Sequence, residues 1–271
     1  MVRKEDIVAS LKNVGLSKGD DVIFHSSLKS FGYVEGGPET VISAFLDVVT
    51  ENGTVMVPTL CQKDFQNSYK TWNINKPSDT GLITEVFRLM PEALRSNQGT
   101  HSIAAIGKRA EYYTKDHGKD GLRLGRYGYT PFSGDSPWQK IYDNNAVIIL
   151  LGVDFKSYTL KHLIEYLLVE HNLKEAREKG EYDKYASMIL RFDVPIDARE
   201  GYIWPYIAPQ KLDDFVKENN LYKETMCKEC KIIFVRAKDM GELLYNDLLK
   251  RPEYWYEGHD ERVLKWMLMN I

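Results

Sequence analysis

Apolar and polar residues follow two different spacings along the first sixty residues of the chain. Residues 4–14 place apolar side chains every three or four positions, which predicts a helix with one buried face. Short apolar runs at 21–25 and 54–58 are typical of buried strands, and the segment between them has helical spacing after Pro38, a residue favoured in the first turn of a helix. Strand, loop, helix and strand form a βαβ unit, so we expect the two strands to pair in parallel.

The rest of the chain continues this succession of strands and helices. Further strands are expected at 102–106 and 146–151, with a strand-like stretch at 186–206. Further helices are expected at 81–90, 160–179, 211–219 and 238–250. Residues 61–80 and 116–137 show no clear period, and two such long loops in one compact domain are typical of an active site. With no repeat and no break in composition, residues 1–271 are expected to form a single α/β domain.

Composition and charge narrow the functional classes. The chain has 271 residues with 39 acidic against 36 basic side chains, and its net charge of -3 gives no general attraction to DNA or RNA. Three cysteines cannot form a disulfide framework, and the charged start of the chain lacks the apolar core of a signal peptide. The longest apolar run, 146–151, is far too short to span a bilayer. We therefore expect a cytoplasmic protein that binds neither nucleic acid nor membrane.

A polar, glycine-marked loop joins the first strand to the helix that follows it. Ligands bind at this position in open α/β sheets, because the free N–H groups and the dipole of the helix face outward. Gly36 and Gly37 would let the backbone come close to a phosphate, and Lys29 adds a cationic donor. The loop matches neither of the glycine-rich phosphate motifs. A site for a phosphate-bearing cofactor and an ordinary strand-to-helix connection with capping hydroxyls both fit these residues.

His162 and Glu165 stand three residues apart near the start of the helix predicted at 160–179. This spacing puts both side chains on one face of the helix. A carboxylate can fix the tautomer of an imidazole and stabilise its protonated form, so the pair suits a general base. An exposed pair without a catalytic role has the same spacing, and the residues alone leave both interpretations open.

The remaining candidates are a single histidine and an isolated cysteine motif. His101 precedes the strand predicted at 102–106 and could also lie at the sheet edge. Cys227 and Cys230 form a lone C-x-x-C with no second pair, so we expect two free or buried thiols rather than zinc ligands. The histidines show no metal-ligand spacing, and the chain lacks the G-x-S-x-G elbow of the α/β-hydrolases. No metal is expected.

Four blocks, in order, resemble the motifs of the aminoglycoside 3-N-acetyltransferase family, acyl-coenzyme A enzymes that are unrelated in fold to the GNAT acetyltransferases. Residues 24–37 are similar to its H-S-S-L-x-S-x-G-x-V-x-G-G loop, and 55–59 to its strand ending in M-P-T. Residues 95–107 resemble its R-S-x-H-P-T-H-S-x-A-A-x-G block, and 134–165 its G-x-x-S-P, L-L-G-V and T-x-L-H-x-x-E series. The resemblance covers residues 5–170 closely. It implies a single α/β domain with a mixed, mostly parallel sheet and helices on both faces.

The resemblance also implies an acyl-CoA-dependent N-acyltransferase that transfers the acyl group directly. The matching histidine of the family is the general base, so His162 would take this role, and Glu165 would orient it or meet the ammonium of the substrate. Coenzyme A would run from the paired glycines along the loop toward Thr59 and Ser102. Backbone N–H groups, or a hydroxyl at Thr59 or Ser102, could receive the oxyanion. The residues expected to contact the acyl donor are Ser26, Ser27, Leu28, Lys29, Tyr33, Gly36, Gly37, Thr59 and Ser102. Those expected to contact the acceptor are His101, Trp204 and Tyr206.

Two departures from the family pattern bear on the site. Gln98 and Gly99 replace the first histidine and the proline of the H-P-T-H-S block. Residues 204–211 contain no acid, where the family often has an acidic run that can help to hold a polycationic drug. We therefore expect the acceptor to be an amino deoxysugar linked to a nucleotide, used in surface-glycan biosynthesis, with Trp204 or Tyr206 stacked on the base.

Acetyl transfer to an aminoglycoside antibiotic is the alternative, and a non-catalytic coenzyme-binding module is an interpretation of another class. The acyl group, acetyl or 3-hydroxyacyl, stays open. The expected partners are thus small molecules, acyl-CoA and an amino sugar. A second copy of the chain in a homodimer is expected only because dimers are the commonest oligomers.

Overall fold

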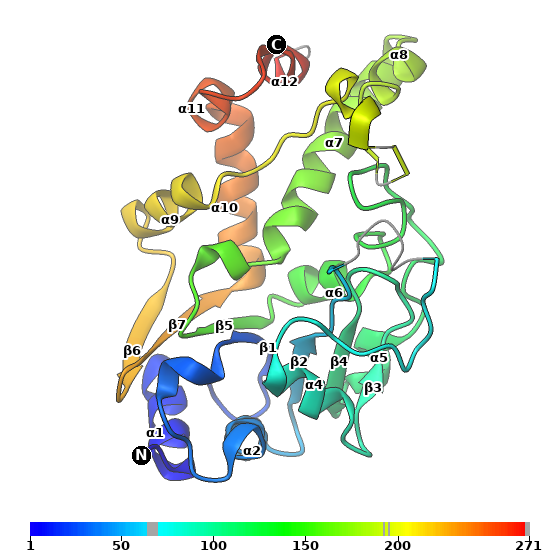
Figure 1. The fold of residues 1–271 in the computed structure, drawn as a ribbon. Helices are drawn as coiled ribbons and strands as arrows, with labels where there is room; N and C mark the ends of the chain where they lie inside the picture. The colour runs from blue at the N-terminus through cyan, green and yellow to red at the C-terminus, as the bar shows by residue number, and fades with distance from the viewer. Residues whose placement is uncertain (64–69, 192, 195, 269–271) are drawn as a thin grey trace.

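The computed structural model describes residues 1–63, 70–191, 193–194 and 196–268, and a seven-stranded sheet runs through its centre (Figure 1). The strands lie side by side in the order β3-β4-β2-β1-β5-β7-β6. Their bounds are β1 (Asp21–Ser26), β2 (Thr54–Pro58), β3 (Leu94–Arg95), β4 (Ile103–Gly107), β5 (Val147–Leu151), β6 (Lys223–Cys227) and β7 (Cys230–Arg236). The central strands are buried on both faces, which explains their nearly continuous apolar sequences.

Parallel pairing is confined to the three central strands. β1 pairs with both β2 and β5, and α2 (Gly37–Val49) connects β1 to β2, which confirms the predicted βαβ unit. The pairs β2–β4, β3–β4, β5–β7 and β6–β7 are antiparallel. The sheet is therefore mixed as predicted, but its parallel part is smaller than expected. Short connections such as the turn between Cys227 and Cys230, which face each other across the β6–β7 hairpin, permit only antiparallel pairing.

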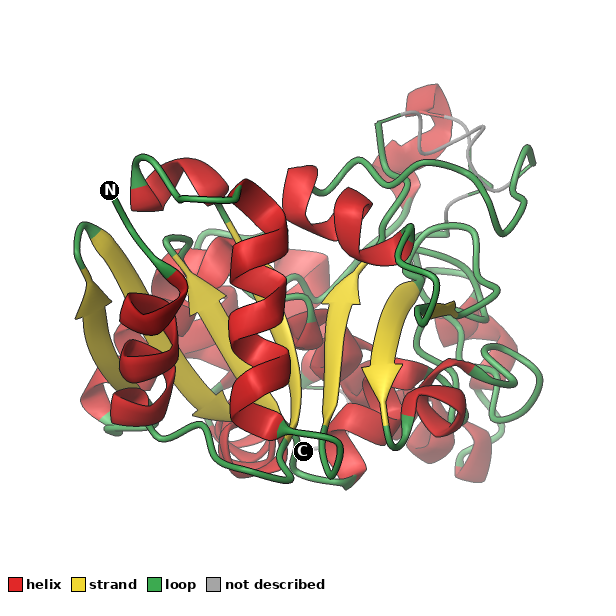
Figure 2. Cartoon of the chain, turned by 90° about the horizontal axis from the view of Figure 1, so that it is seen from below, coloured by secondary structure: helices red, strands yellow, loops and turns green. Residues whose placement is uncertain are grey.

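Helices cover both faces of the sheet, as predicted, and α1 and α2 lie in front of it in Figure 2. Side chains alternate along β1, so Phe24 points to one face, where it stacks on Phe45 of α2 at 4.1 Å, and Ile23 points to the other. The first face is covered by α1 (Lys4–Val14), α2 and α4 (Leu82–Arg88). The second is covered by α5 (Ala110–Thr114), α6 (Pro137–Asp143), α7 (Leu160–Glu178) and α10 (Ala237–Lys250).

The remaining helices are short or peripheral. They are α8 (Tyr182–Ala186), α9 (Pro209–Glu218), α11 (Pro252–Tyr256), α12 (Glu261–Met267) and the 3-10 turns η1 (Leu28–Phe31), η2 (Phe155–Ser157) and η3 (Ile196–Gly201). Most of the short helices, together with β3, β6 and β7, are absent from the sequence-based prediction. None of the described helices is both long and apolar enough to cross a membrane.

The strand-like stretch predicted at 186–206 is wrong. Its described residues form no strand, and a single bridge joins Ile189 to Ile203. Both isoleucines are buried in the core that α7 shares, so the apolar residues here reflect packing of an irregular segment. The loop predicted at 116–137 is irregular until α6 begins at Pro137, and the described part of 61–80 is irregular too. Residues 64–69 of that second loop lie outside the described residues.

Candidate active site

The carboxyl ends of the three parallel strands meet at one edge of the sheet, and a cleft of about 220 Å³ opens there. β1 contributes His25 and Ser26, its last two residues, and the chain after β2 contributes Gln62. His101, which precedes β4, and His162, in the first turn of α7, complete the polar wall. Open α/β sheets bind their ligands at this edge. We therefore take the cleft as the candidate active site.

His162 and Glu165 lie together on α7, as their spacing predicts. The Nδ1 atom of His162 is 2.8 Å from Oε2 of Glu165, which fixes the ring and leaves Nε2 for a substrate. The Glu165 side chain is fully buried, and 15% of the His162 side chain is exposed. This burial excludes an ordinary exposed pair, and it identifies an imidazole oriented at the wall of the cleft.

Two further groups hold the Glu165 carboxylate. The indole N–H of Trp204 donates to Oε2 at 2.8 Å, and the backbone N–H of Ile207 donates to Oε1 at 2.9 Å. With no exposed surface, the carboxylate is placed to orient His162 rather than to meet the ammonium of a substrate. Trp204 is itself buried against Tyr166, so it supports the carboxylate. Tyr206, two residues after Trp204, is half-buried, and the Lys161 ammonium lies 5.6 Å from the centre of its ring.

His101 is fully buried and lines the cleft next to His162, with the two ring centres 6.3 Å apart. Its Nδ1 lies 2.9 Å from the Thr100 hydroxyl, and its Nε2 lies 3.2 Å from the Gln62 amide. Burial, and then the neighbouring His162, lower the pKa of His101 well below its ordinary value. Gln98, which stands where the family has a histidine, accepts hydrogen bonds from the backbone N–H groups of Thr100 and His101. Its amide therefore shapes the turn that presents His101.

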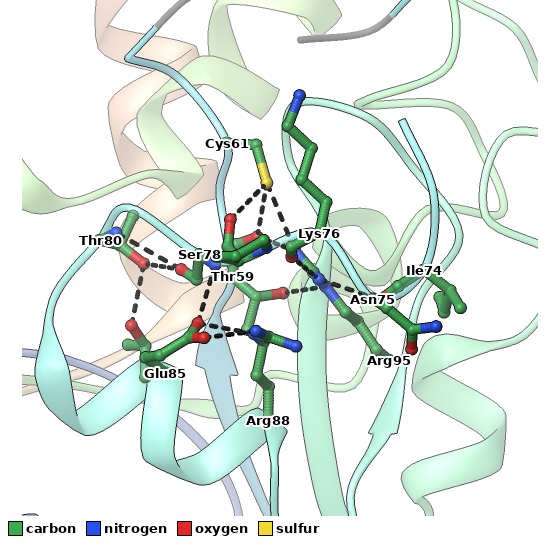
Figure 3. A network of polar contacts seen from close by, with 12 residues as sticks. Thr59, Cys61, Ile74, Asn75, Lys76, Ser78, Thr80, Glu85, Arg88 and Arg95 are labelled. Carbon is green, nitrogen blue, oxygen red and sulfur yellow. Dashed lines mark hydrogen bonds and ion pairs between the residues drawn. The ribbon is translucent and has the colours of Figure 1, made fainter. Parts of the chain in front are cut away.

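Thr59 and Ser102 do not line the cleft, although the sequence places both near the acyl donor. Both are fully buried, and their hydroxyl oxygens lie 3.0 Å apart. Arg95 donates from Nε to both hydroxyls and from a terminal nitrogen to the Thr59 carbonyl, as Figure 3 shows for Thr59. The same guanidinium binds the carbonyls of Ile74 and Lys76. The two hydroxyls are thus buried in a hydrogen-bond network around Arg95, where they cannot contact an oxyanion in the cleft.

The predicted coenzyme loop leaves β1 at the cleft and then runs outward. Ser26 lines the cleft, and the other predicted residues of the loop, Ser27, Leu28, Lys29, Tyr33, Gly36 and Gly37, are at least partly exposed. Gly36 and Gly37 open α2 with positive φ of 75° and 63°. A Cβ at Gly36 would also lie 2.5 Å from the Thr40 hydroxyl oxygen, so this turn requires glycine. The N–H of Gly37, the first residue of α2, donates to the Val34 carbonyl at 3.1 Å and closes this turn.

His25 is a cleft residue that the sequence prediction missed as a candidate. It is 6% exposed, and burial together with the charge of Lys161 lowers its pKa to about 4. The available signal was its place at the end of the first buried strand, directly before Ser26. Away from the cleft, His117 is held between the Ser96 hydroxyl and the Pro131 carbonyl, and burial lowers its pKa to about 4 as well.

These buried histidines predict a loss of stability in mild acid. The folded protein keeps them neutral, whereas the unfolded chain protonates them near pH 6.5, so the unfolded state binds more protons below that pH. The free energy of unfolding should fall as pH drops from about 6.5 toward 4, by about 1.4 kcal/mol per pH unit for each such proton. Urea unfolding at several pH values measures the slope. His117→Gln should lower the slope by one proton, and an unchanged slope would show that His117 does not titrate on unfolding.

Residues 23–245 match the family model described as aminoglycoside 3-N-acetyltransferase. The chain belongs to this family. One relative, the SPbeta prophage-derived aminoglycoside N(3')-acetyltransferase-like protein YokD of Bacillus subtilis (strain 168), is 36% identical over 184 residues, covering 60% of this chain and 64% of the relative. Aminoglycoside N(3)-acetyltransferase VII of Streptomyces paromomycinus is 33% identical over 184 residues, covering 61% of each chain. These alignments span less than two thirds of the relatives' length.

Solved structures of aminoglycoside acetyltransferases share the fold along almost the whole chain. The apoenzyme of AAC(3)-IVa gives a TM-score of 0.72 at 20% identity and covers 98% of both chains. The binary complex of AAC-IIIb with CoASH gives 0.69 at 19% identity, covering 92% of this chain and 97% of the other. At these identities the likeness shows the fold alone, and it confirms the predicted α/β architecture of this aminoglycoside 3-N-acetyltransferase family member.

The family corrects the expected acceptor. The relatives are named as aminoglycoside N(3)-acetyltransferases, and nothing in them points to a nucleotide-linked amino sugar, so that prediction is wrong and its aminoglycoside alternative fits better. The error came from residues 204–211, which were interpreted as a wall for the acceptor. The structure uses Trp204 and Ile207 of this stretch to hold Glu165, and α9 begins at Pro209. The lack of acids there therefore carries no information on the charge of the acceptor.

Proposed function

We propose that this protein is an acetyl-CoA-dependent N-acetyltransferase that acetylates an amine of an aminoglycoside, with His162 as the general base. The observation that carries the proposal is the oriented His162–Glu165 pair at the carboxyl ends of the parallel strands. Membership in the aminoglycoside 3-N-acetyltransferase family supports both the reaction and the class of acceptor. A solved relative in complex with CoASH and others in complex with a gentamicin, apramycin or sisomicin support the two substrates.

His162 takes up the proton that the attacking amine loses as it becomes an amide. An amine of the acceptor is protonated near neutral pH and cannot attack a thioester until it loses a proton. That first proton is released to solvent. With Nδ1 held by Glu165, Nε2 of His162 accepts the second proton, which leaves the amine nitrogen as the new C–N bond forms. Glu165 stabilises the resulting imidazolium, because its buried carboxylate lies 2.8 Å away. The C–S bond then breaks, and the imidazolium returns the proton to the sulfur of coenzyme A.

The loop between β1 and α2 is the proposed site for coenzyme A. Ser26 would contact the end of the pantetheine arm, because it lines the cleft beside His25. The exposed Gly36 and the N-terminal end of the 13-residue helix α2 suit the pyrophosphate. Ser27, Leu28, Lys29 and Tyr33 extend this surface. The acceptor would enter on the side of His101 and Tyr206, near Tyr127, whose ring centre lies 4.6 Å from that of His101 and 5.1 Å from that of His162.

A direct assay tests the proposed function. Purified protein with acetyl-CoA should release free thiol only when an aminoglycoside is present, and mass spectrometry should find the drug heavier by one acetyl group. Acetyl-CoA without an acceptor is the control for hydrolysis. Binding of acetyl-CoA without turnover of a panel that includes gentamicin, apramycin and sisomicin would contradict the proposal and favour a coenzyme-binding module.

A further inference from the structure

His25 differs from the other buried histidines described above in its hydrogen bonding. Both ring nitrogens of His101 and of His117 have partners within the protein. In the part of the chain that the structure describes, neither ring nitrogen of His25 has a hydrogen-bond partner, although only 6% of the residue is exposed. Its ring lies near that of Trp138, at 6.4 Å between centres, which supplies packing but no polar contact.

This lack of a partner points to a ligand. Neither ring nitrogen of His25 is fully enclosed by protein, so both can be reached from the cleft. His25 lines the cleft, together with His162, and follows directly on the buried core of β1. The backbone of a central strand holds it, so its position is fixed before any substrate arrives. A group that enters the cleft is therefore the available partner.

The protonation state of His25 decides what it can do for that ligand. The pKa of the ring is lowered to about 4 by burial first and by the positive charge of Lys161 second. Lys161 is itself buried, with 3% exposed, and donates to the Lys156 carbonyl at 3.2 Å. At neutral pH the imidazole therefore carries one N–H and no charge. Such a ring can donate a hydrogen bond, and it has little tendency to take up a proton.

We propose that His25 donates a hydrogen bond to the carbonyl oxygen of the acyl thioester and stabilises the negative charge that develops there. This inference rests on the proposed function. The amine nitrogen bonds to the carbonyl carbon, the C=O electron pair moves to oxygen, and His25 keeps its proton throughout. When the C–S bond breaks, the electron pair returns from oxygen to carbon, and His162 delivers its proton to sulfur.

The arrangement of the cleft favours this role over a second base. His162 already has the buried carboxylate that a base needs, and His25 has instead a neighbouring cation that opposes protonation. Thr59 and Ser102, the hydroxyls that the sequence suggests for the oxyanion, are engaged by Arg95. A neutral N–H held in place by a central strand is an effective donor to a developing oxyanion, because it needs no reorganisation during the reaction.

Substitution of His25 tests the proposal by kinetics. His25→Ala should lower kcat by about 10²–10³-fold, as the loss of one oxyanion donor does, while the Kd for acetyl-CoA changes little. His25→Asn and His25→Gln place an amide N–H in the same region, and at least one of them should recover part of the lost rate. His117→Gln is the matched control, because this buried histidine lies away from the cleft, and its kcat should equal that of the wild type. A His25→Ala variant with wild-type kcat would overturn the proposal.

A spectroscopic measurement separates this inference from the proposed function. The thioester carbonyl of acetyl-CoA labelled with carbon-13 should absorb at lower frequency when bound to the wild type than in water, and the shift should be lost in His25→Ala. If the shift depends on His25 and no aminoglycoside is acetylated, the proposed function fails and the inference stands. If the shift is equal in both proteins, the inference fails. A wild-type protein that does not bind acetyl-CoA would overturn both.

Discussion

Replacing His162 with alanine is expected to lower kcat by about 10²–10⁴-fold, the contribution of a positioned general base. Acetyl-CoA should still bind, because the coenzyme loop between β1 and α2 does not depend on this side chain. The expected pattern is thus a fall in kcat at nearly constant affinity for the acyl donor. Steady-state assays of thiol release and calorimetric titration with acetyl-CoA measure the two quantities.

His171 provides the control for that variant. It lies nine residues later on the same helix, outside the cleft, with its ring 6.3 Å from that of Tyr245. His171→Ala should keep the wild-type kcat. If His162→Ala were equally active, His162 would not be the base, and the mechanism derived from its contact with Glu165 would have to be abandoned.

Glu165→Leu is expected to reduce both activity and stability. The change removes the acceptor of three hydrogen bonds and leaves the N–H groups of Trp204 and Ile207 buried without partners. Each such group costs about 1–3 kcal/mol, so the free energy of unfolding should fall by about 2–5 kcal/mol. Glu165→Gln keeps an oxygen acceptor but loses the charge that stabilises the imidazolium. Its stability should lie between the other two proteins, and its kcat should still fall strongly.

Urea unfolding and kinetics on the same preparations distinguish these effects. Glu178→Leu, at the exposed end of α7, is the control, and its unfolding free energy should stay within about 0.5 kcal/mol of the wild type. If Glu165→Leu unfolded at the same urea concentration as the wild type, the carboxylate would not be the structural link between α7 and residues 204–207.

Features that depend on local spacing could be predicted from the sequence. The βαβ unit follows from apolar runs of strand length on both sides of a helix, and the contact between His162 and Glu165 follows from one turn of helix geometry. The irregular loops around the cleft follow from their lack of period. Such features need no knowledge of which distant segments meet.

Features that depend on tertiary contacts could not be predicted in the same way. Trp204 donates a hydrogen bond to Glu165, which lies 39 positions earlier in the sequence. Arg95 donates one to the Thr59 hydroxyl, which lies 36 positions earlier. Ile189 and Ile203 are apolar because they enter the core, and nothing in their spacing distinguishes this from a strand. The environment of His25 depends on the charge of Lys161 and on the ring of Trp138, both more than a hundred positions away in the sequence.

Residues 204–208, which follow η3, contain two kinds of position, because two of these residues donate hydrogen bonds to the Glu165 carboxylate. The Trp204 indole and the Ile207 backbone hold the carboxylate that orients His162, so loss of the indole is expected to disturb the proposed base. Tyr206 and Ala208 stand between and beside them without touching that carboxylate, and both are partly exposed. Substitutions at these two positions are therefore expected to leave the orientation of His162 unchanged. The same short segment can thus vary at some positions while the two that hold Glu165 stay fixed.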